Sequence, residues 1–111
     1  MCTFDTLYIG KDGYVVRCTK CNRYQVAAGV LCITLVEDDF AHLKKLTGDA
    51  CMYVDAQSNS STKCFAIGTP FYGVDFLFNA QELLAFNTML EAADNEAKAL
   101  SLMAMFNTTH H

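Results

Sequence analysis

TLYIGKDGYVVRCTKC, residues 6–21, combines two strand patterns, a turn and two closely spaced cysteines. Residues 6–9 and 14–17 are rich in β-branched and aromatic side chains, which favour β-strands. Asp12-Gly13 between them is a common two-residue hairpin turn. The stretch therefore predicts an antiparallel β-hairpin that leads directly into Cys18 and Cys21.

Four more strands are expected further along the chain. Residues 23–28 and 30–36 flank Gly29, which gives the backbone freedom to turn; a helix over 23–28 is the competing prediction. Residues 63–78 hold two apolar runs separated by Gly68-Thr69-Pro70-Phe71, where proline cannot donate to a β-ladder. The polar run 57–62 has little to bury and predicts an exposed loop.

Residues 37–47 predict a short amphipathic helix. Acidic residues come first and lysines last, which suits the helix dipole. Phe40, Leu43 and Leu46 fall on one face, and Gly48 is the expected end of the helix.

A long C-terminal helix is predicted over residues 80–106, which are rich in Ala, Leu, Glu and Met. Asn79 and Glu82 have the spacing of a capping box. Twenty-seven helical residues would span about 40 Å, whereas a compact domain of this size is roughly 34 Å across. We therefore expect the helix either to break near Asp94-Asn95 or to protrude. Its apolar stripe comprises Leu83, Phe86, Leu90, Ala93, Ala97, Leu100 and Ala104.

These patterns predict an α+β fold, in which an antiparallel β-sheet of hairpins packs against the long C-terminal helix and one shorter helix. With 111 residues, the chain is expected to form a single domain over residues 1–111. The hairpins and the cysteine pair occupy residues 1–36 of this domain.

Charge and composition exclude some function classes and favour others. The net charge is −4 and the eight basic residues are scattered, so no nucleic-acid partner is expected. No signal peptide or apolar run of about eighteen residues is present, so we expect no membrane insertion and a cytoplasmic location. The chain is 52% hydrophobic and only 18% charged, against roughly a quarter charged in an average domain, which suggests that some apolar surface meets another chain.

The cysteines predict a metal site. In a two-residue Asp12-Gly13 turn, residues whose numbers sum to 25 would pair, which would place Asp5 opposite Lys20 and Cys2 close to Cys21. The thiols of Cys2, Cys18 and Cys21 could then converge on one zinc ion, because a Cys-x-x-Cys turn lets two thiolates take adjacent tetrahedral corners about 2.3 Å from the metal. The fourth ligand stays open among Cys51, Cys64, His42 and water. Cys32 is expected near Gln25, which is too far from the other three cysteines for Cys32 to bind the same ion.

Two other interpretations stay open for these residues. Cys18 and Cys21 could serve a thiol–disulfide redox protein or sensor, although a thioredoxin-like site needs its first thiol at a helix N-terminus. The domain could also be metal-free and act through its C-terminal helix. The other cysteines, Cys32, Cys51 and Cys64, are expected to be small buried hydrophobes. No phosphate-binding loop or nucleophile elbow is present, so we predict no enzyme and no catalytic residue.

A protruding helix end would need a partner, because an apolar patch of that size is rarely left in water. The partner is either a second copy in a symmetric homodimer or a different protein. The side chains that we expect at this surface are Leu100, Leu102, Met103, Met105 and Phe106.

The N-terminal third resembles an uncharacterised family of small bacterial proteins, described only as a domain of unknown function. The matching residues are Met1-Cys2, Gly13-Tyr14-Val15-Val16-Arg17-Cys18, Cys21, Tyr24-Gln25-Val26-Ala27 and Gly29. The resemblance implies a bacterial cytosolic origin and equivalent positions for the three cysteines, but no activity. In that family a histidine commonly lies two residues after the first cysteine; this chain has Phe4 there, which puts a fourth ligand at that position in doubt.

Overall fold

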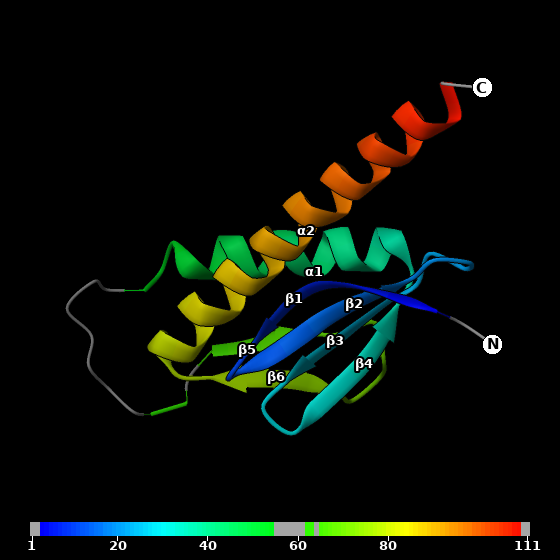
Figure 1. Ribbon diagram of the computed structural model, residues 1–111. Helices are drawn as coiled ribbons and strands as arrows, with labels where there is room; N and C mark the ends of the chain where they lie inside the picture. The colour runs from blue at the N-terminus through cyan, green and yellow to red at the C-terminus, as the bar shows by residue number, and fades with distance from the viewer. Residues whose placement is uncertain (1–2, 55–61, 64, 110–111) are drawn as a thin grey trace.

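A four-stranded antiparallel sheet, two helices on one of its faces and a small two-stranded sheet make up the fold (Figure 1). The computed structural model describes residues 3–54, 62–63 and 65–109. The predicted α+β architecture is confirmed, including the long C-terminal helix. In chain order the elements are β1 (Phe4–Gly10), β2 (Gly13–Cys18), β3 (Tyr24–Ala28), β4 (Leu31–Leu35), α1 (Glu37–Cys51), β5 (Phe65–Gly68), β6 (Asp75–Phe78) and α2 (Ala80–Thr109).

The large sheet is a simple meander in which each strand pairs with the next along the chain. Gly29 turns β3 into β4 with a φ of 61°, a left-handed conformation that favours glycine. The competing prediction of a helix over residues 23–28 is wrong, because this segment pairs on both sides as the inner strand β3.

The predicted register of the first hairpin is wrong. Gly13 is not a loop residue but pairs with Gly10, so that the two-residue loop is formed by the residues between them. A β-bulge at Leu7 then shifts the pairing by one further residue, which places Phe4 opposite Cys18. Glycine is needed at this position for a different reason, because a Cβ there would clash with the carbonyl oxygen of Ala27 on the neighbouring strand.

Both helices begin near the predicted residues but end later. The capping box of α2 is confirmed: the Asn79 amide donates to a Glu82 carboxylate oxygen at 2.9 Å, and the Glu82 amide donates to Asn79 Oδ1 at 2.8 Å. Helix α1 passes through Gly48, the expected end, and continues to Cys51. Its last turn continues because Ala50 and Cys51 still pack against the core.

The core lies between one face of the large sheet and the two helices. Alternate strand residues such as Val15, Val26 and Ile33 are buried, which is the period-2 pattern of a sheet with one covered face. Tyr24 on β3 stacks on Phe40 of α1, with ring centroids 4.2 Å apart. From α2 the buried side chains are Ala80, Leu83, Phe86, Met89, Leu90, Ala93 and Ala97.

Helix α2 does not break near Asp94-Asn95 but runs on beyond the rest of the fold (Figure 1). The principal extents are 55 × 29 × 23 Å, and the radius of gyration is 15.3 Å. We call residues 101–109 the overhang. Leu100 was expected in water but is half-buried against the core, so the exposed apolar surface begins after it. Within the described ranges, neither helix has an apolar stretch long enough to cross a bilayer.

Candidate functional site

The turn from Cys18 to Cys21 connects β2 to β3 and is built around backbone hydrogen bonds. The Cys18 amide donates to the Arg23 carbonyl at 2.8 Å, and the Asn22 amide donates to the Cys18 carbonyl at 3.0 Å. Asn22 has a φ of 58°, a conformation that asparagine tolerates better than most residues with a side chain. The turn therefore closes in four residues and returns the chain to the sheet.

This turn directs a backbone amide at a cysteine sulfur. The Cys21 amide donates to the Cys18 Sγ at 3.4 Å. An amide N–H directed at a sulfur is one of the interactions that stabilise a metal-bound thiolate. The Cys18 side chain is 1% exposed, whereas Cys21 is exposed. One sulfur is thus held inside the turn and the other lies at the surface.

Thr3, the first described residue, is hydrogen-bonded to this turn. The Thr19 amide donates to the Thr3 carbonyl at 2.9 Å, and the two threonine hydroxyls lie 2.7 Å apart. Phe4 lies directly opposite Cys18 and is half-exposed. Sequence reasoning missed both threonines, because their contact depends on the bulge in β1.

The three-thiol zinc site stays a prediction, because Cys2 lies outside the described residues. Among the residues that the structure describes, no three His, Cys, Asp or Glu side chains come together in a way that could hold a metal ion. The described part of the turn thus supplies two sulfur atoms, from Cys18 and Cys21.

The other cysteines differ in their surroundings. Cys32 was expected to be buried near Gln25, but it is exposed and pairs with Ala27, and its Sγ lies 3.6 Å from the Tyr14 hydroxyl. Cys51 is half-buried at the end of α1. Burial raises the pKa of the Cys51 thiol, and the negative charge of Glu91 raises it further, so this thiol stays neutral. Cys64 lies outside the described residues.

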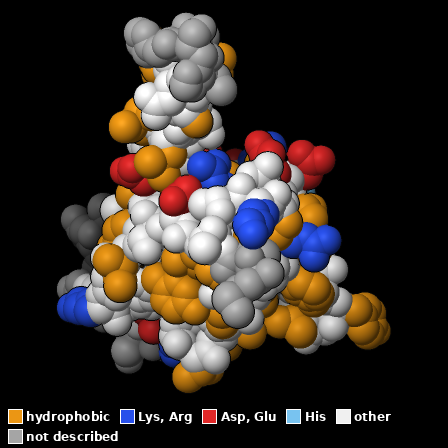
Figure 2. Space-filling model, turned by 45° about the vertical axis from the view of Figure 1, so that its right-hand side comes forward, with side chains coloured by type: hydrophobic (Ala, Val, Ile, Leu, Met, Phe, Trp, Pro, Cys, Tyr) orange, Lys and Arg blue, Asp and Glu red, His pale blue; other side chains and the backbone are white. Residues whose placement is uncertain are grey.

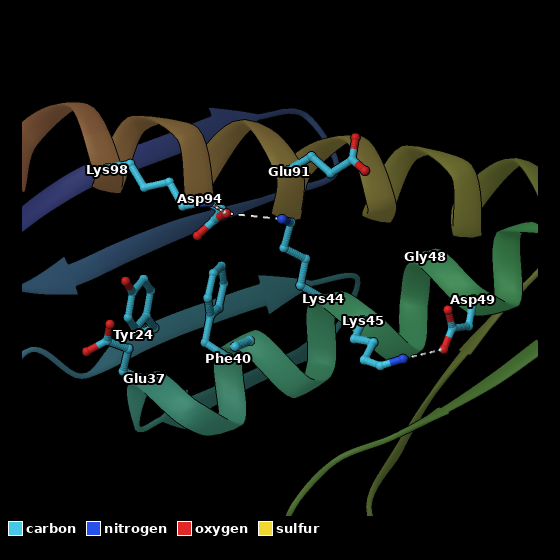
Figure 3. A pocket seen from close by; sticks show the side chains of 11 residues that line it. Tyr24, Glu37, Phe40, Lys44, Lys45, Gly48, Asp49, Glu91, Asp94 and Lys98 are labelled. Carbon is cyan, nitrogen blue, oxygen red and sulfur yellow. Dashed lines mark hydrogen bonds and ion pairs between the residues drawn. The ribbon is translucent and has the colours of Figure 1, made fainter.

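A second candidate site is a groove of about 540 Å³ between α1 and α2 (Figure 3). The stacked rings of Tyr24 and Phe40 lie at one end of it. Asp94 on α2 accepts hydrogen bonds from Lys44 on α1 at 3.0 Å and from Lys98 at 2.8 Å. The i,i+4 spacing of Asp94 and Lys98 was a visible signal in the sequence, but the contact with Lys44 depends on how the helices pack.

In this groove, Asp94 is paired with two lysines. Burial alone would raise the pKa of Asp94, but the hydrogen bonds from Lys98 and Lys44 outweigh it and hold the pKa below its ordinary value. The same contact raises the pKa of Lys98. These groups are engaged in holding α1 against α2, and we assign the groove no chemistry.

We predict that Asp94→Asn destabilises the fold by about 1 kcal/mol at neutral pH, because Asp94 is 19% exposed and bridges two helices. A lowered pKa in the folded state means that the stabilisation is complete above the unfolded-state pKa of about 3.9. It is lost as the pH falls through the lower folded-state pKa. Urea unfolding at several pH values should therefore show the wild-type advantage shrinking in acid.

Asp49→Asn is the matched control, since Asp49 forms an exposed i,i+4 pair with Lys45 on α1 alone. Its cost should stay below about 0.5 kcal/mol. Equal costs for the two variants would contradict the proposed role of Asp94 in joining the helices.

The geometry at Cys18 differs from that of a thioredoxin-like site. Cys18 is the last residue of β2, and the helices begin at Glu37 and Ala80. Neither thiol of the pair therefore lies at a helix N-terminus, where the dipole would lower its pKa and make it nucleophilic.

Comparisons of this chain with protein-family profiles, with curated proteins and with solved structures find no match. The function of this chain is therefore inferred from its own geometry.

Proposed function

We propose that this protein is a non-enzymatic, cytoplasmic interaction module whose N-terminal hairpin is stabilised by a zinc ion bound to Cys2, Cys18 and Cys21. The observation that carries the proposal is the hydrogen bond from the Cys21 amide to the Cys18 sulfur. Zinc binds cysteine as a thiolate, and the amide N–H donated to this sulfur would help to stabilise a zinc-bound Cys18 inside the turn.

The third ligand comes from the N-terminus. Thr3, the residue that follows Cys2, is hydrogen-bonded to Thr19 inside the turn. The zinc ion would join the residue before β1 to the turn between β2 and β3. These two parts of the chain are distant in sequence. The fourth ligand stays open, because Cys64 lies outside the described residues and the described ones hold no cluster of three metal-binding groups. The resemblance to a bacterial family with cysteines at the same three positions supports the same assignment.

The module would act through the overhang, where an apolar helix end is available to a protein partner. A redox protein using Cys18 and Cys21 is the second candidate, since the exposed Cys21 is accessible to other thiols. A metal-free domain acting through the same helix is the third. The three candidates differ in how Cys21 reacts.

Thiol alkylation mapped by mass spectrometry tests the proposal. In reduced protein, Cys21 should be protected without chelator and should react quickly once a zinc chelator is added. Cys32 is the matched control, because it is also exposed and should react equally in both conditions.

Other outcomes identify the alternatives. A Cys21 that reacts as fast as Cys32 without chelator excludes the zinc site. If Cys21 instead becomes unreactive only after oxidation, the redox candidate is favoured. A Cys2→Ser variant that keeps Cys21 fully protected would remove Cys2 from the ligand set.

A further inference from the structure

We propose that the overhang of α2 pairs with the overhang of a second copy of this chain in an antiparallel, two-fold symmetric dimer. This inference deepens the proposed function by naming the partner, and it depends on that proposal only for the surface involved. Figure 2 shows the overhang standing clear of the body, with hydrophobic side chains on both sides of it.

The exposed apolar side chains form a ridge rather than a narrow stripe. Leu102 and Phe106 are four residues apart and share one face, while Met103 and Met105 flank it, so that they cover about 160° of the helix circumference. Their exposed fractions are between 57% and 65%. A flat partner surface would cover only one flank of such a ridge.

An antiparallel pair covers both flanks. The overhang is about 13 Å long, from nine residues at 1.5 Å each, so that its tip would reach the base of the partner's overhang. At that base, Ser101 accepts a hydrogen bond from Arg17 of β2 at 3.5 Å. One flank would then contact the partner's helix, and the other would contact the partner's body around Arg17 and Ser101.

The area is sufficient for a dimer. At roughly 200 Å² for a large side chain, the four exposed side chains present about 500 Å² on each copy. Complete burial of these residues in two copies would remove about 1,000 Å² from water, which is the lower bound for a specific interface.

Charge favours a second copy over a charged partner. Each chain carries a net charge of −4, so two copies repel in general. After Lys98, however, the sequence contains no Asp, Glu, Lys or Arg. In a two-fold interface, each surface patch contacts the same patch of the second copy. A patch without charges therefore avoids the like-charge repulsion that other surfaces of this acidic chain would create.

The test is the molar mass in solution, by light scattering at about 100 μM, where a micromolar pair is associated. The wild type should have twice the 12.3 kDa of one chain. The double variant Leu102→Glu, Met103→Glu should have half the wild-type mass, with an unchanged helical circular dichroism spectrum. Leu84→Glu is the matched control: Leu84 is exposed on the body half of the same helix, and the mass should stay doubled.

A wild-type monomer at this concentration, or a double variant that stays dimeric, overturns the proposal. A second pair of variants guards against misfolding: Leu102→Lys, Met103→Lys should also be monomeric, and mixing it with the Glu variant should restore the doubled mass. Zinc content measured on the same samples separates the two proposals. A dimer without metal contradicts only the zinc site, and a zinc-bound monomer contradicts only the dimer interface.

Discussion

Cys18→Ser is expected to release the zinc ion and to destabilise the protein by at least about 3 kcal/mol, because metal binding at such a site is folding free energy. For a domain of this size the melting temperature should fall by roughly 10–20 °C. Thermal unfolding followed by circular dichroism, with and without chelator, measures the effect. The wild type should melt at a lower temperature with chelator, while the variant should be insensitive to it.

Chelator dependence separates metal loss from a packing effect, since serine also places a hydroxyl at a position that is only 1% exposed. Cys32→Ser is the control: Cys32 is exposed, and its replacement should leave the melting temperature and the chelator response unchanged. If Cys18→Ser folded normally but abolished insulin-disulfide reduction, the redox candidate would replace the zinc site. If chelator changed the melting temperature of neither the wild type nor the variant, the metal-free domain would be favoured.

Leu90→Ala is expected to destabilise the protein by about 2–5 kcal/mol, because Leu90 is completely buried and truncation leaves a cavity. Leu90 belongs to the stripe by which α2 packs on the sheet and α1. Chemical denaturation of the variant measures the loss.

Leu84→Ala is the matched control on the same helix, where the side chain is 44% exposed. It should change the stability by less than about 0.5 kcal/mol. If Leu90→Ala cost no more than Leu84→Ala, the packing of α2 described here would be wrong.

Most of the fold could be predicted from local patterns. The strands, the two helices and the capping box of Asn79 and Glu82 follow from propensity, periodicity and side-chain chemistry, which act within a few residues. The ends of the helices could not be predicted in this way. Helix α1 passes through Gly48 because of tertiary packing in its last turn, which a local pattern does not contain.

The register of the first hairpin shows why the site was only partly predictable. Asp12-Gly13 indicates a turn, but Gly13 serves instead as the strand residue that lets the Ala27 carbonyl approach. The bulge at Leu7 leaves no signal in the alternation of the strand. As a result, the contact of Thr3 with Thr19 was missed, although the Cys-x-x-Cys spacing correctly indicated a tight turn.

The course of the C-terminal end of α2 could be predicted only in part. Length alone predicted that α2 would either break or protrude, and the structure has the unbroken form. The stripe from Leu83 to Ala97 is buried as expected, whereas Ala104 is exposed because the body ends before it.

The zinc site is the central claim, and the metal content of reduced, tag-free protein tests it most directly. Elemental mass spectrometry should find about one zinc ion per chain, and the Cys18→Ser variant should contain none. Wild-type protein that is folded, reduced and free of bound metal after refolding with zinc would contradict the account.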